Sequence, residues 1–127
     1  MRTIYPGEGI SAFGEVIVVT VNYRLGMFGF IQSADGKLPG NQGLLDQPLG
    51  IKLVHDNILA FTVNQNDVTI FGKSAGGASV IFQSLYPGNR GFFQRVIAQS
   101  GSALAYWAAH ATPIAEPRKA ESVRRTQ

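Results

Sequence analysis

The sequence contains no cysteine and very little histidine. Without cysteine, its 127 residues offer no disulfide, no thiolate nucleophile and no cysteine-ligated metal site. The two histidines are His55 and His110. We expect His55, in a predicted helix beside Asp56, to be a solvated surface residue, and His110 to be exposed at the start of the C-terminal tail. Neither is therefore expected to serve as a catalytic base.

A basic surface is also missing from most of the chain. The formal net charge is +3, but residues 116–125 alone carry four basic and two acidic side chains. The 115 residues before them carry seven basic and six acidic side chains, which is close to neutral. Because no basic stripe with interleaved aromatic residues is present, the sequence predicts no nucleic-acid partner.

No apolar run approaches the length that a membrane span requires, so we expect a soluble chain. Met1-Arg2 leads into Pro6-Gly7-Glu8-Gly9 rather than into an apolar stretch, so no signal peptide is visible and the compartment stays undefined. The sequence does not define an oligomeric state either. Its hydrophobic content of 45% and charged content of 15% are typical of a globular chain with a core.

The order of apolar patterns predicts alternating strands and helices after a glycine-rich loop at residues 1–15, which has a brief turn at Ser11–Phe13. The predicted elements are a buried strand at Glu15–Val21, a helix at Leu44–Ala60, a strand beginning at Val68, a helix at Ala75–Leu85 and a strand at Val96–Gln99. This βαβ alternation indicates an α/β fold with a mostly parallel sheet and flanking helices. Three strands are few for such a sheet, so we expect part of a larger domain.

Three side chains near the first long helix carry specific expectations. Asp46 is predicted in the first turn, where a carboxylate suits the helix dipole. Pro48 is predicted in the same turn, where N–H groups have no intrahelical partner. Arg24 lies in an apolar neighbourhood, so we expect it to pair with a carboxylate or a carbonyl group.

The most informative stretch is Gly72-Lys73-Ser74-Ala75-Gly76, which fits the pattern G-x-S-x-G between a strand and a helix. A chain that reverses so sharply forces strained dihedrals on the serine, and we expect Gly72 and Gly76 to remove collisions on either side. Ser74 is then the candidate nucleophile. The Ala75 N–H, at the positive end of the helix, is a candidate donor to an oxyanion.

Other interpretations of this stretch are weaker. The plain alternative is a glycine-rich turn with an incidental serine. A phosphate-binding loop is not indicated, because Lys73 precedes the serine and G-x-x-x-x-G-K-[ST] is not met. Lys73 is not expected to act as the base for Ser74, since adjacent residues on a tight turn point apart. The aspartates are expected to be helix or turn residues rather than triad members, namely Asp46, Asp56 and Asp67.

Four segments together resemble the type-B carboxylesterase/cholinesterase family of α/β-hydrolases. They are VVTVNYRLGMFGF (18–30), GNQGLLDQ (40–47), VTIFGKSAGGASV (68–80) and GFFQRVIAQSGSAL (91–104). The resemblance implies a partial α/β-hydrolase fold over residues 1–110. Residues 111–127 contain Pro113, Pro117 and mixed charges without a period, so we expect a solvated or disordered tail there. The resemblance also implies that Ser74 is the nucleophile, that Ala75 donates to the oxyanion, and that Trp107 lies near the acyl pocket.

The same resemblance implies a small-molecule ester substrate and a mechanism without metal or cofactor. Family members are often secreted or lumenal. The family's His-Gly-Gly oxyanion loop, acidic triad member and catalytic histidine are not found in this sequence, so we expect a truncated segment with little turnover alone. The usual glutamate before the serine is Lys73 here. A cation there would lower the pKa of a nearby imidazole and disfavour the imidazolium formed during acyl transfer.

Three functional hypotheses follow from these observations. The first is a serine carboxylester hydrolase that acts through an acyl-enzyme on Ser74, of which this chain is a segment. The second is a non-catalytic, neuroligin-type interaction domain, which Lys73 and the missing triad partners favour. The third is an inactive truncated product.

Overall fold

The computed structural model describes residues 6–33 and 35–109 of the chain. In chain order, its elements are α1 (Glu8–Gly14), α2 (Gly26–Phe30), α3 (Gln42–Asn57), the 3₁₀ turn η1 (Ile58–Phe61), β1 (Thr69–Lys73), α4 (Ala75–Leu85), the 3₁₀ turn η2 (Pro87–Asn89) and β2 (Arg95–Gln99). His110 and the predicted tail at 111–127 lie outside the described residues. No helix in the described ranges is long and apolar enough to cross a bilayer.

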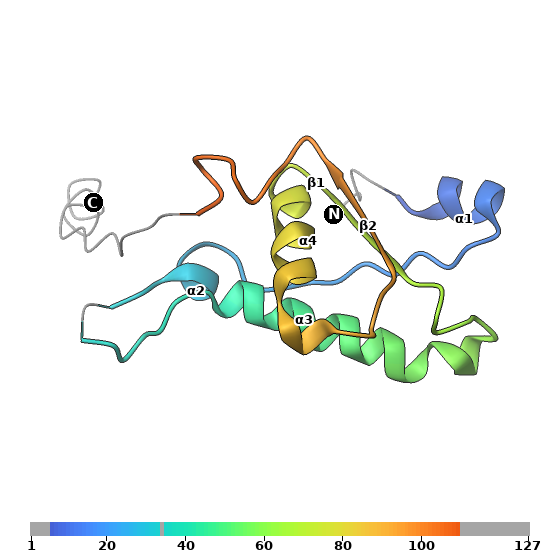
Figure 1. Cartoon of the computed structure of the whole chain (residues 1–127), viewed down its shortest axis with the longest axis horizontal. Helices are drawn as coiled ribbons and strands as arrows, with labels where there is room; N and C mark the ends of the chain where they lie inside the picture. The colour runs from blue at the N-terminus through green and yellow to red at the C-terminus, as the bar shows by residue number, and fades with distance from the viewer. Residues whose placement is uncertain (1–5, 34, 110–127) are drawn as a thin grey trace, which may run out of the picture.

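The strands β1 and β2 form a parallel pair, and α4 connects them. Their register runs from Thr69 opposite Arg95 to Lys73 opposite Gln99. The helix α4 packs against both strands, beginning at their carboxyl ends and descending to α3 (Figure 1). The predicted strand–helix–strand order and the parallel pairing are therefore confirmed for this part of the chain.

The predicted strand at Glu15–Val21 is wrong. Residues 16–25 form an extended segment that has no ladder partner among the described residues. A β-branched run becomes a strand only when neighbouring strands accept its hydrogen bonds and cover its faces. Here Val19 stays 47% exposed, and the segment instead lies along α3, where a Cβ at Gly50 would come within 2.6 Å of Val21.

The predicted N-terminal loop is also wrong, because α1 occupies Glu8–Gly14. The carbonyl of Gly7 accepts the N–H of Ser11 at 2.9 Å, which closes the first turn. Glu8 lies in that turn, where its negative charge suits the helix dipole. None of the residues of α1 is buried, so α1 contributes little to the core.

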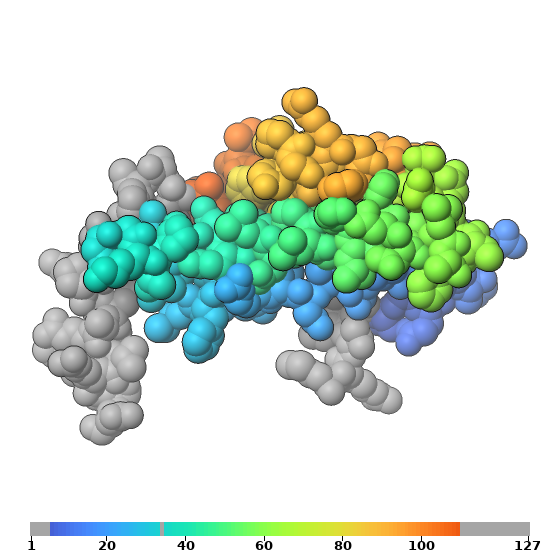
Figure 2. Space-filling view, turned by 90° about the horizontal axis from the view of Figure 1, so that it is seen from below, coloured from blue at the N-terminus to red at the C-terminus, as the bar shows by residue number. Residues whose placement is uncertain are grey.

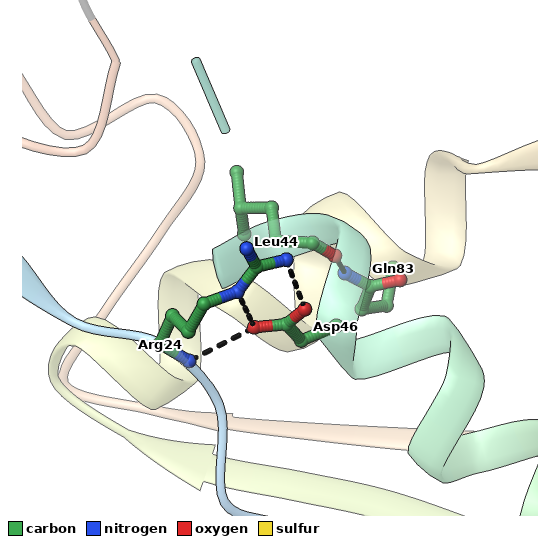
Figure 3. Close-up of polar contacts among 4 residues, drawn as sticks. All are labelled: Arg24, Leu44, Asp46 and Gln83. Carbon is green, nitrogen blue, oxygen red and sulfur yellow. Dashed lines mark hydrogen bonds and ion pairs between the residues drawn. The ribbon is translucent and has the colours of Figure 1, made fainter. Parts of the chain in front are cut away.

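The long helix α3 begins at Gln42, two residues earlier than predicted, so Asp46 lies beyond the first turn. Its carboxylate is held by Arg24 instead. The Arg24 Nε donates to Oδ2 at 2.8 Å and Nη2 donates to Oδ1 at 2.7 Å, while the Arg24 backbone N–H donates to Oδ2 at 3.0 Å (Figure 3). The sequence predicts a carboxylate or a carbonyl partner for Arg24, and this bidentate pair shows that the partner is the carboxylate of Asp46, which joins the extended segment to α3.

Replacing Asp46 with asparagine should remove a pH-dependent part of the stability. The hydrogen bonds from Arg24 lower the pKa of Asp46 to about 2. This contribution is fully present above about pH 4, the ordinary aspartate range, and disappears as pH falls toward 2. The melting temperature of Asp46→Asn should therefore lie below that of the unmodified chain at pH 7, and the gap should close by pH 2.

Circular dichroism melts at several pH values measure this gap. Asp67→Asn is the matched control, because the exposed Asp67 pairs with Arg95 on the surface and should contribute less. A gap for Asp46→Asn that is the same at pH 7 and at pH 2 would contradict the linkage.

Pro48 lies inside α3 rather than in its first turn, so the predicted reason for its tolerance is wrong. A proline in a helix interior leaves the carbonyl four residues earlier without its N–H donor. That carbonyl belongs to Leu44, and the side chain of Gln83 in α4 donates to it at 2.9 Å (Figure 3). A side chain of another helix thus supplies the hydrogen bond that the proline cannot make.

Gln83 is the centre of a buried polar cluster between α3 and η2. Its Nε2 also donates to Gln47 Oε1 at 2.9 Å, and its Oε1 accepts from Asn89 Nδ2 at 2.7 Å. Gln83, Gln47 and Asn89 are 4%, 7% and 2% exposed. Figure 2 shows α3 lying across one face of the molecule, between the extended segment on one side and the α4 region on the other. This cluster therefore fixes α4, and with it the end of β1, against α3.

Candidate active site

Ser74 lies at the single-residue junction between β1 and α4. Its φ of 56° and ψ of −118° place it in a conformation that residues with a Cβ rarely adopt. It is exposed, and within the described residues its hydroxyl makes no capping hydrogen bond to α4. The strained dihedrals and the immediate start of a helix agree with what the G-x-S-x-G spacing predicts.

Backbone hydrogen bonds hold Ser74 from both sides. Its N–H donates to the carbonyl of Gln99 at 2.8 Å, which extends the β1–β2 ladder by one step. Its carbonyl accepts the N–H of Ala78 at 3.1 Å, which closes the first turn of α4. Because both backbone groups are engaged, the positive φ of Ser74 is imposed by the sheet and the helix together.

The glycines around Ser74 differ in what they allow. A Cβ at Gly72 would overlap the backbone of Gly76, so the chain needs glycine at 72. A Cβ at Gly76 would meet nothing within 4 Å, so the predicted collision at that position is wrong. The crowding is one-sided, because the backbone of Gly76 fills the space that a Gly72 side chain would need, whereas a Cβ on Gly76 points into open space.

The helix α4 begins at Ala75, directly behind Ser74, and extends over 11 residues. The first N–H groups of a helix have no intrahelical acceptor, and the helix dipole adds positive potential there. No acidic residue lies in the first turn of α4 to offset that potential. The Ala75 N–H is therefore suited to donate to an oxygen that gains negative charge beside Ser74.

The structure does not bring a histidine to Ser74 within the described residues. His55 lies in α3, where its ring centroid is 5.0 Å from that of Phe92 and its Nδ1 is 3.4 Å from Asp56. Phe92 precedes β2, at the opposite end of the sheet from Ser74 (Figure 1). This agrees with the expectation that His55 is not the base, and His110 lies outside the described residues.

Trp107 lies in a series of turns that follows β2 and remains 42% exposed. Two of the apolar hollows in the described part of the chain are not lined by Ser74, Ala75 or Trp107. One lies between α3 and α4, and the other lies between Val19 and the end of α3. Residues 6–33 and 35–109 contain no group of three His, Asp or Glu side chains that could hold a metal ion.

Sequence reasoning missed the glycines that crowd the back of the elbow. A Cβ at Gly77 would come within 3.0 Å of the Gln99 carbonyl oxygen. A Cβ at Gly101 would overlap the carbonyl oxygen of Ser74. The sequence does contain a signal for them, because Gly77 directly follows Gly76 in α4 and Gly101 lies two residues after the end of β2. Glycine at such positions permits two backbones to touch.

A parallel strand that runs into a strained, exposed serine and at once into a helix has the backbone geometry of the nucleophile elbow in α/β-hydrolases. The model of the carboxylesterase family matches residues 1–124. The chain therefore belongs to the carboxylesterase family.

Individual relatives agree with this assignment. The chain is 50% identical to the bile salt-activated lipase of Homo sapiens over 111 residues, which are 87% of this chain and 15% of the relative. It is 53% identical to the juvenile hormone esterase of Tribolium castaneum over 94 residues, 74% of this chain and 16% of that protein. It is 43% identical to acetylcholinesterase 4 of Caenorhabditis briggsae over 121 residues, 95% of this chain and 20% of that protein. The chain thus spans a fifth or less of the length of these three relatives.

Proposed function

We propose that this chain carries the nucleophile of a serine carboxylester hydrolase and that Ser74 is that nucleophile. Membership of the carboxylesterase family supports ester hydrolysis as the general chemistry. The observation that carries the specific proposal is the conformation of Ser74, with φ at 56° between β1 and α4. A strained, exposed serine held by the ends of two elements is costly to maintain, and such strain is concentrated at functional sites.

On this proposal, Ser74 Oγ attacks the carbonyl carbon of a small-molecule ester. The carbonyl oxygen becomes an oxyanion and accepts the N–H of Ala75 at the start of α4. The tetrahedral intermediate then expels the alcohol, which leaves the acyl group on Ser74, and water releases the acid. The proton of Ser74 needs an imidazole base, and His55 does not reach it, so the base comes from outside residues 6–109.

Trp107 completes the proposed site as part of the acyl pocket. Its side chain is 42% exposed, and it follows by eight residues the end of β2, the strand whose last carbonyl accepts the Ser74 N–H. Ligands of open α/β sheets bind outside the carboxyl ends of the strands. A large, partly exposed aromatic face that follows such an end is suited to contact the apolar part of an ester.

A fluorophosphonate probe tests the proposal on the purified chain. The strained, exposed Ser74 and the N–H groups at the start of α4 favour phosphonylation, and the lack of a base nearby makes it slow. We expect slow covalent labelling at Ser74, located by peptide mass spectrometry, and loss of that label in Ser74→Ala. Ser84→Ala is the matched control, because Ser84 lies in α4 and its hydroxyl donates to the carbonyl of Ile81.

Two measurements make the labelling experiment decisive. Equal labelling of the unmodified chain and Ser74→Ala would refute the proposal. Hydrogen exchange of the β1 and β2 amides, recorded on the same samples, shows whether the elbow is folded when the probe is added.

The second candidate is a non-catalytic interaction domain. Lys73 favours it, because a cation beside the serine opposes the imidazolium that acyl transfer forms. Folded strands with no labelling at Ser74 would support this candidate, whereas labelling at Ser74 would exclude it.

A further inference from the structure

The turn that follows β2 packs against the back of Ser74. The alpha carbon of Gly101 and the start of α4 are so close that a Cβ at 101 would overlap the Ser74 carbonyl oxygen and come within 3.0 Å of the Ala78 nitrogen. Those two atoms form the hydrogen bond that closes the first turn of α4. Gly101 therefore touches the bond that orients Ser74, rather than Ser74 alone.

Gly77 faces the same turn from the helix side. A Cβ there would come within 3.0 Å of the Gln99 carbonyl oxygen and 3.1 Å of the Gly101 alpha carbon. The Gln99 carbonyl is the acceptor for the Ser74 N–H, at 2.8 Å. At Gly77 and Gly101, the backbone of α4 thus packs directly against the backbone of the turn that follows β2. This contact lies beside both backbone hydrogen bonds of Ser74.

The exit of β2 has a second unusual conformation beside this contact. Ser100 adopts a φ of 51°, so both parallel strands end in a serine with positive φ, at 74 and at 100. The turn at Ser100 brings Gly101 back against the Ser74 carbonyl instead of letting the chain continue along the strand. The strained conformation of Ser100 therefore makes the contact between Gly101 and Ser74 possible.

We propose that Gly101, supported by Gly77, is a positioning residue for Ser74. It confines the Ser74 carbonyl to the direction in which it accepts the Ala78 N–H, and this confinement holds the hydroxyl of Ser74 at its attacking position. The inference rests on the proposed function for its chemical consequence. Its geometric part, the conformation of Ser74, can be measured without catalysis.

Gly101→Ala tests the proposal on the full chain. The φ of Gly101 is not in the left-handed region, so alanine does not strain its own backbone there and acts only through its methyl group. Because the methyl group meets backbone atoms, the Ser74 carbonyl must move. We expect fluorophosphonate labelling at Ser74 to fall at least about tenfold, since a misplacement of about 1 Å can cost about 100-fold.

Gly50→Ala is the matched control for lost stability. A Cβ at Gly50 would come within 2.6 Å of Val21, so this variant is also crowded, but it lies in α3 where that helix meets the extended segment. Labelling at Ser74, compared at equal folded fraction, should stay within twofold of the unmodified chain. The second readout is hydrogen exchange of the Ser74 amide, which should accelerate about tenfold or more in Gly101→Ala. The Ile70 amide, which faces β2 in the same ladder, should keep its protection.

The outcomes separate the two claims. Selective loss of labelling and selective opening of the Ser74 amide in Gly101→Ala support the positioning role. Equal changes in Gly101→Ala and Gly50→Ala, or no change in either readout, overturn it. If the unmodified chain is not labelled at all, the proposed function fails, and selective exchange at Ser74 alone still supports the role of Gly101 in holding the elbow.

Discussion

A chimera that carries residues 6–109 in place of the matching segment of the human bile salt-activated lipase should hydrolyse esters, and Ser74→Ala should lower its kcat by at least about 10⁴-fold. The 50% identity between the two proteins makes the exchange feasible, and the lipase supplies the rest of the domain. The physical reason is that the serine oxygen forms the bond to the acyl group, so no neighbouring residue replaces it. Steady-state hydrolysis of a p-nitrophenyl ester measures the effect.

The same chimera tests the charge beside the nucleophile. In the proposed site a cation at 73 would lower the pKa of the imidazole base, so Lys73→Glu should raise kcat by about tenfold or more. The base must be neutral to accept the Ser74 proton. The acidic limb of the kcat/KM profile should therefore lie at lower pH with lysine and move to higher pH with glutamate.

Lys73→Gln separates charge from size in this series. It removes the cation without adding an anion, so its kcat and its acidic limb should fall between those of lysine and glutamate. If all three side chains give the same pH profile, the charge at 73 does not act on the base.

A chimera that folds but shows the same rate with and without the Ser74 hydroxyl would refute the nucleophile assignment.

Gln83→Leu should lower the free energy of unfolding by about 3 kcal/mol, since each buried polar group left without a partner costs about 1–3 kcal/mol. Leucine keeps most of the volume but removes the donor to the Leu44 carbonyl and to Gln47, and the acceptor for Asn89. Pro48 has no N–H to replace the lost donor. Urea unfolding followed by circular dichroism measures the loss.

Pro48→Ala provides the matched background for this measurement. Alanine at 48 has an N–H that can donate to the Leu44 carbonyl, so Gln83→Leu should cost about 1 kcal/mol less there than in the unmodified chain. Ser84→Ala, next to Gln83 but on the exposed side of α4, should change stability by less than about 0.5 kcal/mol. Equal costs of Gln83→Leu in both backgrounds would show that the glutamine does not substitute for the missing helix bond.

Features that depend on neighbouring residues could be predicted from the sequence. The strand β1, the strain at Ser74 and the start of α4 follow from one short pattern, in which glycine at 72 permits the close approach of 76. That Arg24 has a partner could also be predicted, because a guanidinium group in an apolar stretch needs one, although the sequence leaves open whether it is a carboxylate or a carbonyl group. The family itself followed from four segments, and the family model confirms it.

Features that depend on distant segments could not be predicted in the same way. Residues 16–21 have the composition of a strand, but a strand also needs a partner, and composition does not supply one. The Pro48 interpretation failed because the donor to Leu44 comes from α4, 35 residues after the proline. The contact of Gly101 with Ser74 likewise joins residues that only the fold brings together.

The hydrogen bond from Gln83 to the Leu44 carbonyl also couples the substitutions that positions 48 and 83 should tolerate. A descendant that replaces Pro48 with a residue that has an N–H regains the helix hydrogen bond to the Leu44 carbonyl. Selection to keep the Gln83 side chain is then relaxed. A descendant that loses Gln83 first leaves the Leu44 carbonyl oxygen without a donor until Pro48 is replaced too. Neutral drift at these two codons should therefore proceed in a preferred order, with position 48 changing before position 83.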